Sequence, residues 1–180
     1  MHRDPLLKKL RSYHPIDAHE TEMHRRMLAF ISANPDCFER TNISGHITAS
    51  ALIVNPQRTR TLMTHHHKLE KWLQLGGHSD GDPNPLNVAL REAEEESGLR
   101  QCIPVSEDIF DVDVHTIPAR KDEPEHFHYD IRFLFEADDS IGLTISSESK
   151  DLAWVPINEI EQYTVEESIL RMVRKLKTHS

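Results

Sequence analysis

The sequence predicts an α/β domain that follows a helical N-terminal segment. Three patterns carry this prediction: apolar residues at helical spacing before residue 44, alternating apolar and polar residues in short segments after residue 45, and two further helical patterns at 83–97 and 164–176. A chain of 180 residues is long enough for one domain with a sizeable core and some decoration. We therefore expect a helical extension over 1–44 and one main domain over 45–180.

The extension has the start and stop signals of a helix. Asp17 and Glu20 form a capping-box pattern, and Asn34-Pro35 ends the helical stretch. The apolar residues between these signals share one helical face: Met23, Met27, Phe30 and Ile31. This face either packs on the main domain, or forms the surface of a homodimer or a lid over a substrate.

The main domain has several predicted strands. In chain order they lie at 47–54, 60–65, 72–75, 109–117, 126–136 and 153–155. The strand at 126–136 alternates most cleanly. Its apolar face consists of Phe127, Tyr129, Ile131, Phe133 and Phe135, and its polar face of His126, His128, Asp130 and Arg132. Asp82-Pro83 predicts the start of the helix at 83–97, and Thr164 with Glu167 predicts the start of the last helix.

Composition excludes several classes of protein. The net charge of −9 disfavours strong binding to nucleic acid backbones, although a metal ion can make an acidic protein bind polyphosphates. The two cysteines, Cys37 and Cys102, form neither a metal-ligand spacing nor a disulfide framework, which favours a reducing cytoplasm. No apolar stretch is long enough to span a membrane, and no secretory signal is evident.

Residues 91–99 are the most informative segment. Glu92, Glu95 and Glu96 lie at positions i, i+3 and i+4, so a helix places their carboxylates on one face. Like charges at this spacing repel by a few tenths of a kcal/mol per pair, and no lysine is interleaved among them. Clustered carboxylates suit a hard divalent cation, which prefers oxygen ligands. Gly98 follows where a left-handed residue ends the helix.

This segment resembles the Nudix box. Gly77 matches its first glycine, and the residues of its second half stand in register: Arg91, Glu92, Ala93, Glu95, Glu96, Gly98 and Leu99. The first glutamate of the box falls on Pro83, so we expect Asp80 or Asp82 to replace it as a partner of Arg91. The resemblance implies an α/β/α sandwich with a mixed sheet and an enzyme that hydrolyses a diphosphate linkage in a small molecule.

The resemblance also implies roles for individual residues. Glu95 and Glu96 are expected to bind Mg²⁺ or Mn²⁺, and Glu92 is expected to be a third ligand or the general base. Arg91 orients these glutamates, and the carbonyl of Gly76 is a further expected ligand. Many relatives use a later loop acid as a base or ligand, and Glu148 or Asp151 has the spacing for this role, although either is equally well explained as a solvated loop residue.

Histidines are the second unusual feature, because the chain has 13 of them. His126, His128 and Asp130 point the same way from one strand. They either face solvent or line the substrate cleft opposite Glu95 and Glu96, where they contact phosphate or a second metal. Gly77 and His78 belong to the expected substrate loop, in which His78 either donates to phosphate or caps the loop.

Two other functions share the implied fold. Isopentenyl-diphosphate isomerases also have a Gly-His after this strand, but they need a catalytic cysteine, and neither cysteine here lies near the predicted site. A non-catalytic ligand-sensing module is expected where the box is degenerate; Pro83 favours it slightly and the intact glutamates oppose it. The sequence does not name the substrate, because loops that vary within one fold determine it.

Overall fold

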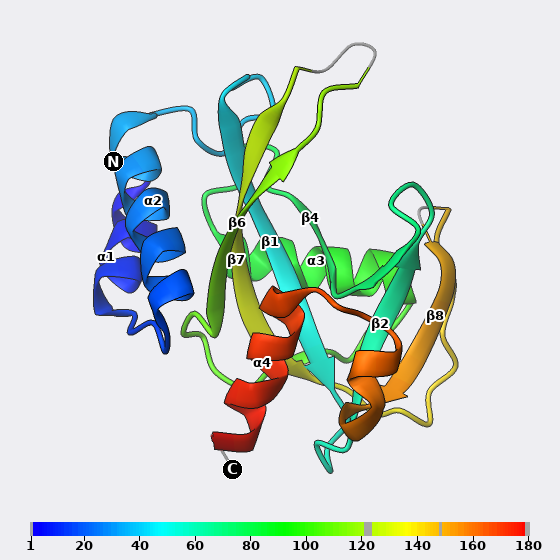
Figure 1. Ribbon diagram of the computed structural model, residues 1–180. Helices are drawn as coiled ribbons and strands as arrows, with labels where there is room; N and C mark the ends of the chain where they lie inside the picture. The colour runs from blue at the N-terminus through cyan, green and yellow to red at the C-terminus, as the bar shows by residue number, and fades with distance from the viewer. Residues whose placement is uncertain (1, 121–123, 148, 179–180) are drawn as a thin grey trace.

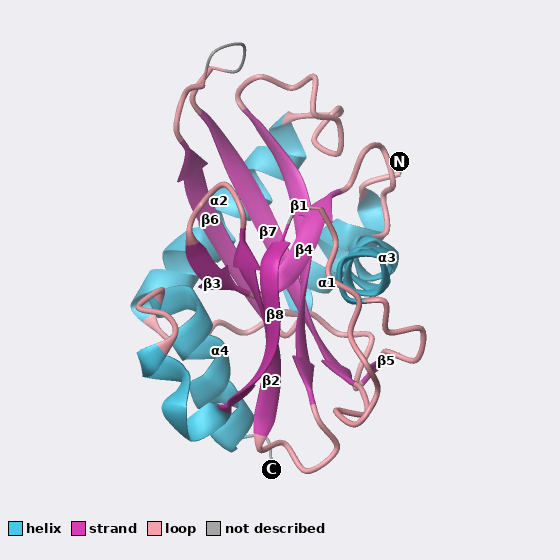
Figure 2. Ribbon diagram, turned by 90° about the vertical axis from the view of Figure 1, so that its right-hand side faces the viewer, coloured by secondary structure: helices cyan, strands magenta, loops and turns pink. Residues whose placement is uncertain are grey.

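The computed structural model describes residues 2–120, 124–147 and 149–178. Within this part of the chain, eight strands form one mixed sheet with helices on both faces, as Figure 1 and Figure 2 show. The elements follow in the order α1 (Asp4–Ser12), α2 (Ala18–Ala33), β1 (Gly45–Val54), β2 (Arg60–His66), β3 (Lys71–Leu73), β4 (Leu75–His78), α3 (Pro85–Ser97), β5 (Ile103–Pro104), β6 (Asp111–Ile117), β7 (His126–Glu136), β8 (Ser149–Pro156), a 3₁₀ helix η1 (Ile157–Gln162) and α4 (Glu167–Thr178). The predicted α/β class with a helical extension is confirmed.

Strand β1 is the centre of the sheet. It pairs in parallel with β7 along its whole length, from Gly45 opposite Phe127 to Val54 opposite Glu136. On its other side it pairs antiparallel with β4 and then with β2. Strand β2 extends the sheet to β3 and β8, while β7 extends it to β6 and β5. The parallel pairing of β1 and β7 brings residues about 80 positions apart in the sequence side by side.

The two faces of the sheet bury different helices. On β1, Ile47 and Ala49 face the larger core with α1, α2 and α3, whereas Leu52 and Val54 face a smaller core with α4. In Figure 2, α3 and α4 accordingly lie on opposite sides of the sheet. The alternation predicted at 126–136 is correct, since all five aromatic and aliphatic residues of its apolar face pack in the larger core or against it.

The N-terminal helices pack on the main domain and share its core. Met27 and Ile31 of α2 are fully buried, and the Phe30 ring stacks on Tyr129 of β7 with 3.9 Å between the ring centroids. The Asp17 side chain accepts a hydrogen bond of 2.7 Å from the Glu20 backbone, which is the predicted cap. The apolar face of α2 is therefore occupied by this packing.

Helix α3 begins two residues later than the sequence predicted. Asn84 is its N-cap, with a side chain that accepts a hydrogen bond from the Leu86 backbone, and Pro85 is the first helical residue. Asp82 instead accepts a bond from the backbone of Asn84 and forms a turn before the helix. Two Asx-Pro pairs follow each other here, and the second one starts the helix. Gly98 ends it in the left-handed region, with φ of 74°, as expected.

A set of charged side chains is buried between the sheet and α4. Lys175 donates to Asp111 at 2.7 Å and also to Glu20 of α2, and Arg171 donates to both oxygens of Asp111. Arg132 donates to Asp130 at 2.7 Å and to Asp113 at 3.3 Å. The buried ion network consists of Glu20, Asp111, Asp113, Asp130, Arg132, Arg171 and Lys175. It joins α2, β6, β7 and α4.

Candidate functional site

Gly76 and Gly77 of β4 let helix α3 approach the sheet closely. A side chain at Gly77 would collide with the Glu92 carboxylate, and a side chain at Gly76 would collide with Ser50 of β1. The Gly76 backbone donates a hydrogen bond of 2.9 Å to Glu96. Glycine is therefore needed at both positions, because neighbouring groups occupy the space where a Cβ would stand.

The three glutamates of α3 differ in environment. Glu96 is buried against Gly76, with 8% of its surface exposed, and Glu92 is half-buried against Gly77. Glu95 is exposed. The structure thus brings Glu92 and Glu96 to the Gly76-Gly77 segment, as the spacing predicted, and leaves Glu95 at the helix surface beside them.

Arg91 has a different partner from the one expected. Its guanidinium donates to Glu92 at 2.8 Å and to the backbone carbonyl of His78 at 3.0 Å. Asp80 forms its ion pair with Arg40, and the Asp82 side chain accepts a hydrogen bond within the turn before α3. The expectation that Asp80 or Asp82 would bind Arg91 is therefore wrong. Arg91 therefore links Glu92 to the end of β4 at His78.

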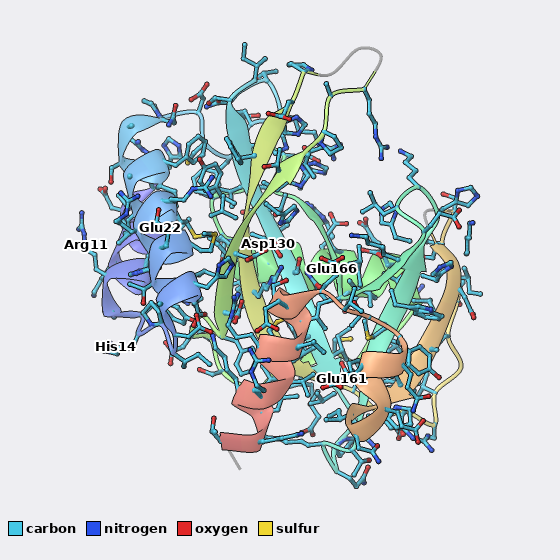
Figure 3. All side chains as sticks on the ribbon, in the orientation of Figure 1. Arg11, His14, Glu22, Asp130, Glu161 and Glu166 are labelled. Atoms are coloured by element: carbon cyan, nitrogen blue, oxygen red, sulfur yellow. The ribbon has the colours of Figure 1, made fainter. Side chains whose placement is uncertain are left out.

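A cleft of about 550 Å³ lies on the α4 side of the sheet. Gly76, Gly77 and Glu96 line one part of it, and His128 and Asp130 line another. Figure 3 shows Asp130 over the middle of the sheet, near Glu166 at the start of α4. Cationic side chains also contribute to its wall: Lys68, Lys71, Arg120 and Arg132. Lys71 is paired with Glu166 and Arg132 with Asp130, so Lys68 and Arg120 are the cations of this wall that suit an anionic ligand.

The polar face of β7 lies toward this cleft, as one of the two interpretations predicted. Of its residues, His128 and Asp130 line the cleft, whereas His126 is buried beside it. Asp130 accepts hydrogen bonds from Thr48, Ser50 and Arg132. Its carboxylate is thus held by protein groups, and direct contact of this face with a substrate stays a prediction.

Five histidines gather at one end of this face. The histidine cluster consists of His46, His78, His115, His126 and His128, from β1, β4, β6 and β7. The centroids of neighbouring rings lie 4.9–5.4 Å apart. Sequence reasoning missed His46, whose only signal was its place on the same strand face as Thr48 and Ser50.

Burial keeps the inner histidines neutral. It lowers the pKa of His78 to about 4 and that of His128 to about 2. Arg40 adds to the shift of His78, and in both cases charge on a neighbouring imidazole would oppose a second charge beside it. The pKa of His46 is lowered by burial and by His126, while the Asn42 backbone opposes this shift only in part. Neutral imidazoles accept hydrogen bonds and bind metal ions.

The remaining candidate residues lie elsewhere. Glu148 falls outside the described residues, and Asp151 is exposed on β8. The two cysteines are buried, and neither lines the cleft. Burial raises the pKa of both thiols to about 11, so they are poor nucleophiles. The cysteine chemistry of an isomerase therefore has no residue at this cleft within the described part of the chain.

Comparison with known proteins identifies the family of the chain. The model of the NUDIX domain family matches residues 45–176, so the chain belongs to this family. No curated protein matches the chain. Within the described residues, no helix is both long and apolar enough to cross a membrane.

Solved structures of Nudix proteins have the same fold. A binary complex of an Ap4A hydrolase from C. elegans superposes with a TM-score of 0.60 at 16% identity, over 74% of this chain and 96% of that one. The dihydroneopterin triphosphate pyrophosphohydrolase of E. coli gives 0.58 at 12% identity, over 74% and 96%. A NUDIX family hydrolase from Clostridium perfringens gives 0.51 at 23% identity, over 75% and 98%. The predicted α/β/α sandwich is confirmed.

Proposed function

We propose that this protein hydrolyses a diphosphate linkage in a nucleoside diphosphate derivative or a similar small molecule, and that it uses Mg²⁺ or Mn²⁺. The observation that carries the proposal is the convergence of Glu92 and Glu96 on Gly76-Gly77 at the wall of a cleft with cationic side chains. The names of the C. elegans and E. coli structures above, an Ap4A hydrolase and a triphosphate pyrophosphohydrolase, are in line with such a substrate.

The donor set fits a hard divalent cation. Carboxylates of Glu92, Glu95 and Glu96 and the carbonyl of Gly76 are all oxygen ligands, which Mg²⁺ and Mn²⁺ prefer. When bound, the cation supplies the charge that neutralises phosphate oxygens and makes water a better nucleophile. Because α3 packs closely against Gly76 and Gly77, the Glu92 carboxylate occupies the space that a side chain at Gly77 would need.

The residues of the chain then do three things. Arg91 holds Glu92 and the His78 carbonyl in fixed positions, which orients the carboxylate. Glu92 serves as a third ligand or accepts the proton of the attacking water. Lys68 and Arg120 bind the rest of an anionic substrate, and Gly77, His128 and Asp130 shape the wall against which it lies.

The test is a hydrolysis assay of the purified protein with Mg²⁺ and with Mn²⁺. The substrates are nucleotide sugars, dinucleoside polyphosphates, nucleoside triphosphates and coenzyme A. Glu96→Gln and Glu95→Gln each remove one charged ligand without removing volume, so we expect kcat to fall by at least ~10²-fold. In the Glu96→Gln variant the amide oxygen of the new side chain can still accept the bond from Gly76, so the fold should be retained.

Glu94→Gln is the matched control, because Glu94 lies on the same helix but is not one of the residues that match the motif. It should leave kcat within about twofold, since it removes charge and not a ligand. EDTA should abolish the activity. Full activity in EDTA, or in the Glu95 and Glu96 variants, would disprove the proposal.

A further inference from the structure

The histidine cluster has a feature that the proposed hydrolysis does not use. His46 is buried, with 4% of its surface exposed, and although the Asn42 backbone lies near enough to oppose the lowering of its pKa, neither ring nitrogen makes a hydrogen bond of standard geometry among the described residues. An unpaired buried polar group costs about 1–3 kcal/mol. His46 lies directly opposite His128 in the parallel pairing of β1 and β7, and the side chains of both lie on the cleft side of the sheet.

Three of the rings already have the spacing of metal ligands. Ligating nitrogens of His46, His78 and His128 all lie within 4.8 Å of one another. The Nε2 atoms of His78 and His128 are 3.3 Å apart. Two imidazoles on one tetrahedral zinc, with Zn–N bonds of about 2.0–2.1 Å, place their nitrogens about 3.3 Å apart. The His78 and His128 nitrogens therefore already have this separation, and the His46 nitrogen lies within 4.8 Å of both.

We propose that His46, His78 and His128 form a binding site for Zn²⁺ or a similar first-row divalent cation, separate from the glutamates of α3. The donor chemistry separates the two sites, because neutral imidazoles favour Zn²⁺ whereas carboxylates and carbonyls favour Mg²⁺. Three histidine ligands leave a fourth coordination position. Since His128 lines the cleft, that position is open to water or to an anion in the cleft.

Two further histidines border the proposed ligands. The Nδ1 atom of His126 is 2.9 Å from the Pro124 carbonyl, which fixes this ring beside His46. His115, whose Nδ1 is 3.5 Å from Asp113, borders His128 on the other side. These two fixed rings pack against the rings of His46 and His128. A bound cation would also give His46 the partner that it lacks in the protein alone.

The test measures binding of the metal alone, so its outcome does not depend on whether the protein hydrolyses a diphosphate. Protein stripped with chelator is titrated with ZnCl₂ by calorimetry in excess Mg²⁺, which occupies the glutamates and binds poorly to imidazole. Co²⁺ absorption reports tetrahedral nitrogen ligands in parallel. We expect one equivalent of Zn²⁺ and a tetrahedral Co²⁺ spectrum.

Asparagine variants at His46, His78 and His128 should each weaken Zn²⁺ binding by at least ~100-fold, because loss of a ligand costs more than loss of an outer contact. His67 is exposed and is the last of three consecutive histidines, His65 to His67. His67→Asn and the Glu95→Gln/Glu96→Gln double variant should bind Zn²⁺ as the wild type does. Zn²⁺ should raise the Tm of the wild type and of these two controls, and not that of the three asparagine variants.

Circular dichroism checks that each variant is folded. If His46→Asn does not fold, the half-buried His78 and His128 carry the test. The proposal is overturned if the wild type shows no Zn²⁺ binding in the micromolar range, or if folded His78 and His128 variants bind as tightly as the wild type. It is also overturned if the His67 variant or the glutamate variant loses the metal, since the ion would then lie elsewhere.

Discussion

The buried ion network and the histidine cluster lie next to each other on one face of β6 and β7, and they differ in one respect. In the network every charged side chain contacts one of opposite sign, for example Lys175 with Asp111 and Arg132 with Asp130. In the cluster, His46 is equally buried and has no such partner among the described residues. The network also holds two nitrogens without a hydrogen bond among the described residues, Nη1 of Arg132 and Nη1 of Arg171, but each belongs to a guanidinium that is otherwise paired, whereas both nitrogens of the His46 ring lack a partner.

The difference shows how to separate a structural from a functional polar group. Buried polar groups that satisfy one another hold elements together, and removal of one leaves the others uncompensated. Buried polar groups without partners lower stability, and proteins keep them mainly where they bind something. The same kind of substitution should therefore have opposite effects on stability in the two regions.

The largest expected effect comes from the network. Lys175→Met removes a cation that is 2% exposed and leaves Glu20 and Asp111 buried with less compensation. We expect the free energy of unfolding to fall by about 3–5 kcal/mol, the usual cost of breaking a buried ion pair from one side. Urea unfolding followed by circular dichroism measures this change.

Arg174→Met is the control on the same helix. Arg174 pairs with Glu167, but the side chains are 51% and 64% exposed, so the loss should stay below about 1 kcal/mol. A Lys175 variant that loses no more stability than the Arg174 variant would contradict the view that the network joins α4 to the sheet and to α2.

The next effect is a pH dependence that arises in the cluster. The pKa of His78 is lowered to about 4 by burial first and then by Arg40, His46 and His126, while Asp80 opposes the shift. The unfolded chain, with a histidine pKa near 6.5, then binds more protons than the folded chain between about pH 4 and 6.5. His78 therefore stabilises the fold less as the pH falls from about 6.5 to about 4.

The slope is about 1.4 kcal/mol per pH unit for each histidine that behaves in this way. Unfolding of metal-free protein in urea at several pH values between about 4.5 and 6.5 should show a shallower dependence in His78→Asn than in the wild type, by about that slope. His67→Asn is the control and should keep the slope of the wild type. Equal slopes in all three proteins would mean that His78 titrates normally.

Sequence patterns predicted what depends on neighbours along the chain. Alternation at 126–136 placed Phe133 in the core and His128 on the other face, and Gly98 ended α3 as expected. The prediction that failed, the partner of Arg91, depends on contacts between residues far apart in the sequence. Asp80 pairs with Arg40, which lies 40 residues away in the sequence, and Arg91 pairs with Glu92 instead. No local pattern shows these long-range choices.

The same limit applies to the two polar regions. Lys175 and Asp111 are 64 residues apart, and only the packing of α4 on the sheet makes them partners. His46 joins His128 because β1 and β7 pair in parallel in one register, and a shift by one residue would turn His46 to the other face. The glutamates of α3 were predictable because one helix carries all of them.

The smallest expected effect is a gain in stability rather than a loss. It tests directly the difference between the buried ion network and the histidine cluster. His46→Leu replaces a buried imidazole that has no partner among the described residues by an apolar side chain of similar size. In metal-free protein we expect the free energy of unfolding to rise by about 1 kcal/mol, because the cost of two unpaired nitrogens is removed. The gain should be confined to metal-free protein, since Zn²⁺ would stabilise only the wild type. Urea unfolding of both proteins with EDTA and with Zn²⁺ measures the two differences. A variant less stable than the wild type in EDTA would show that the His46 nitrogens are satisfied in solution, and the contrast with the buried ion network would be lost.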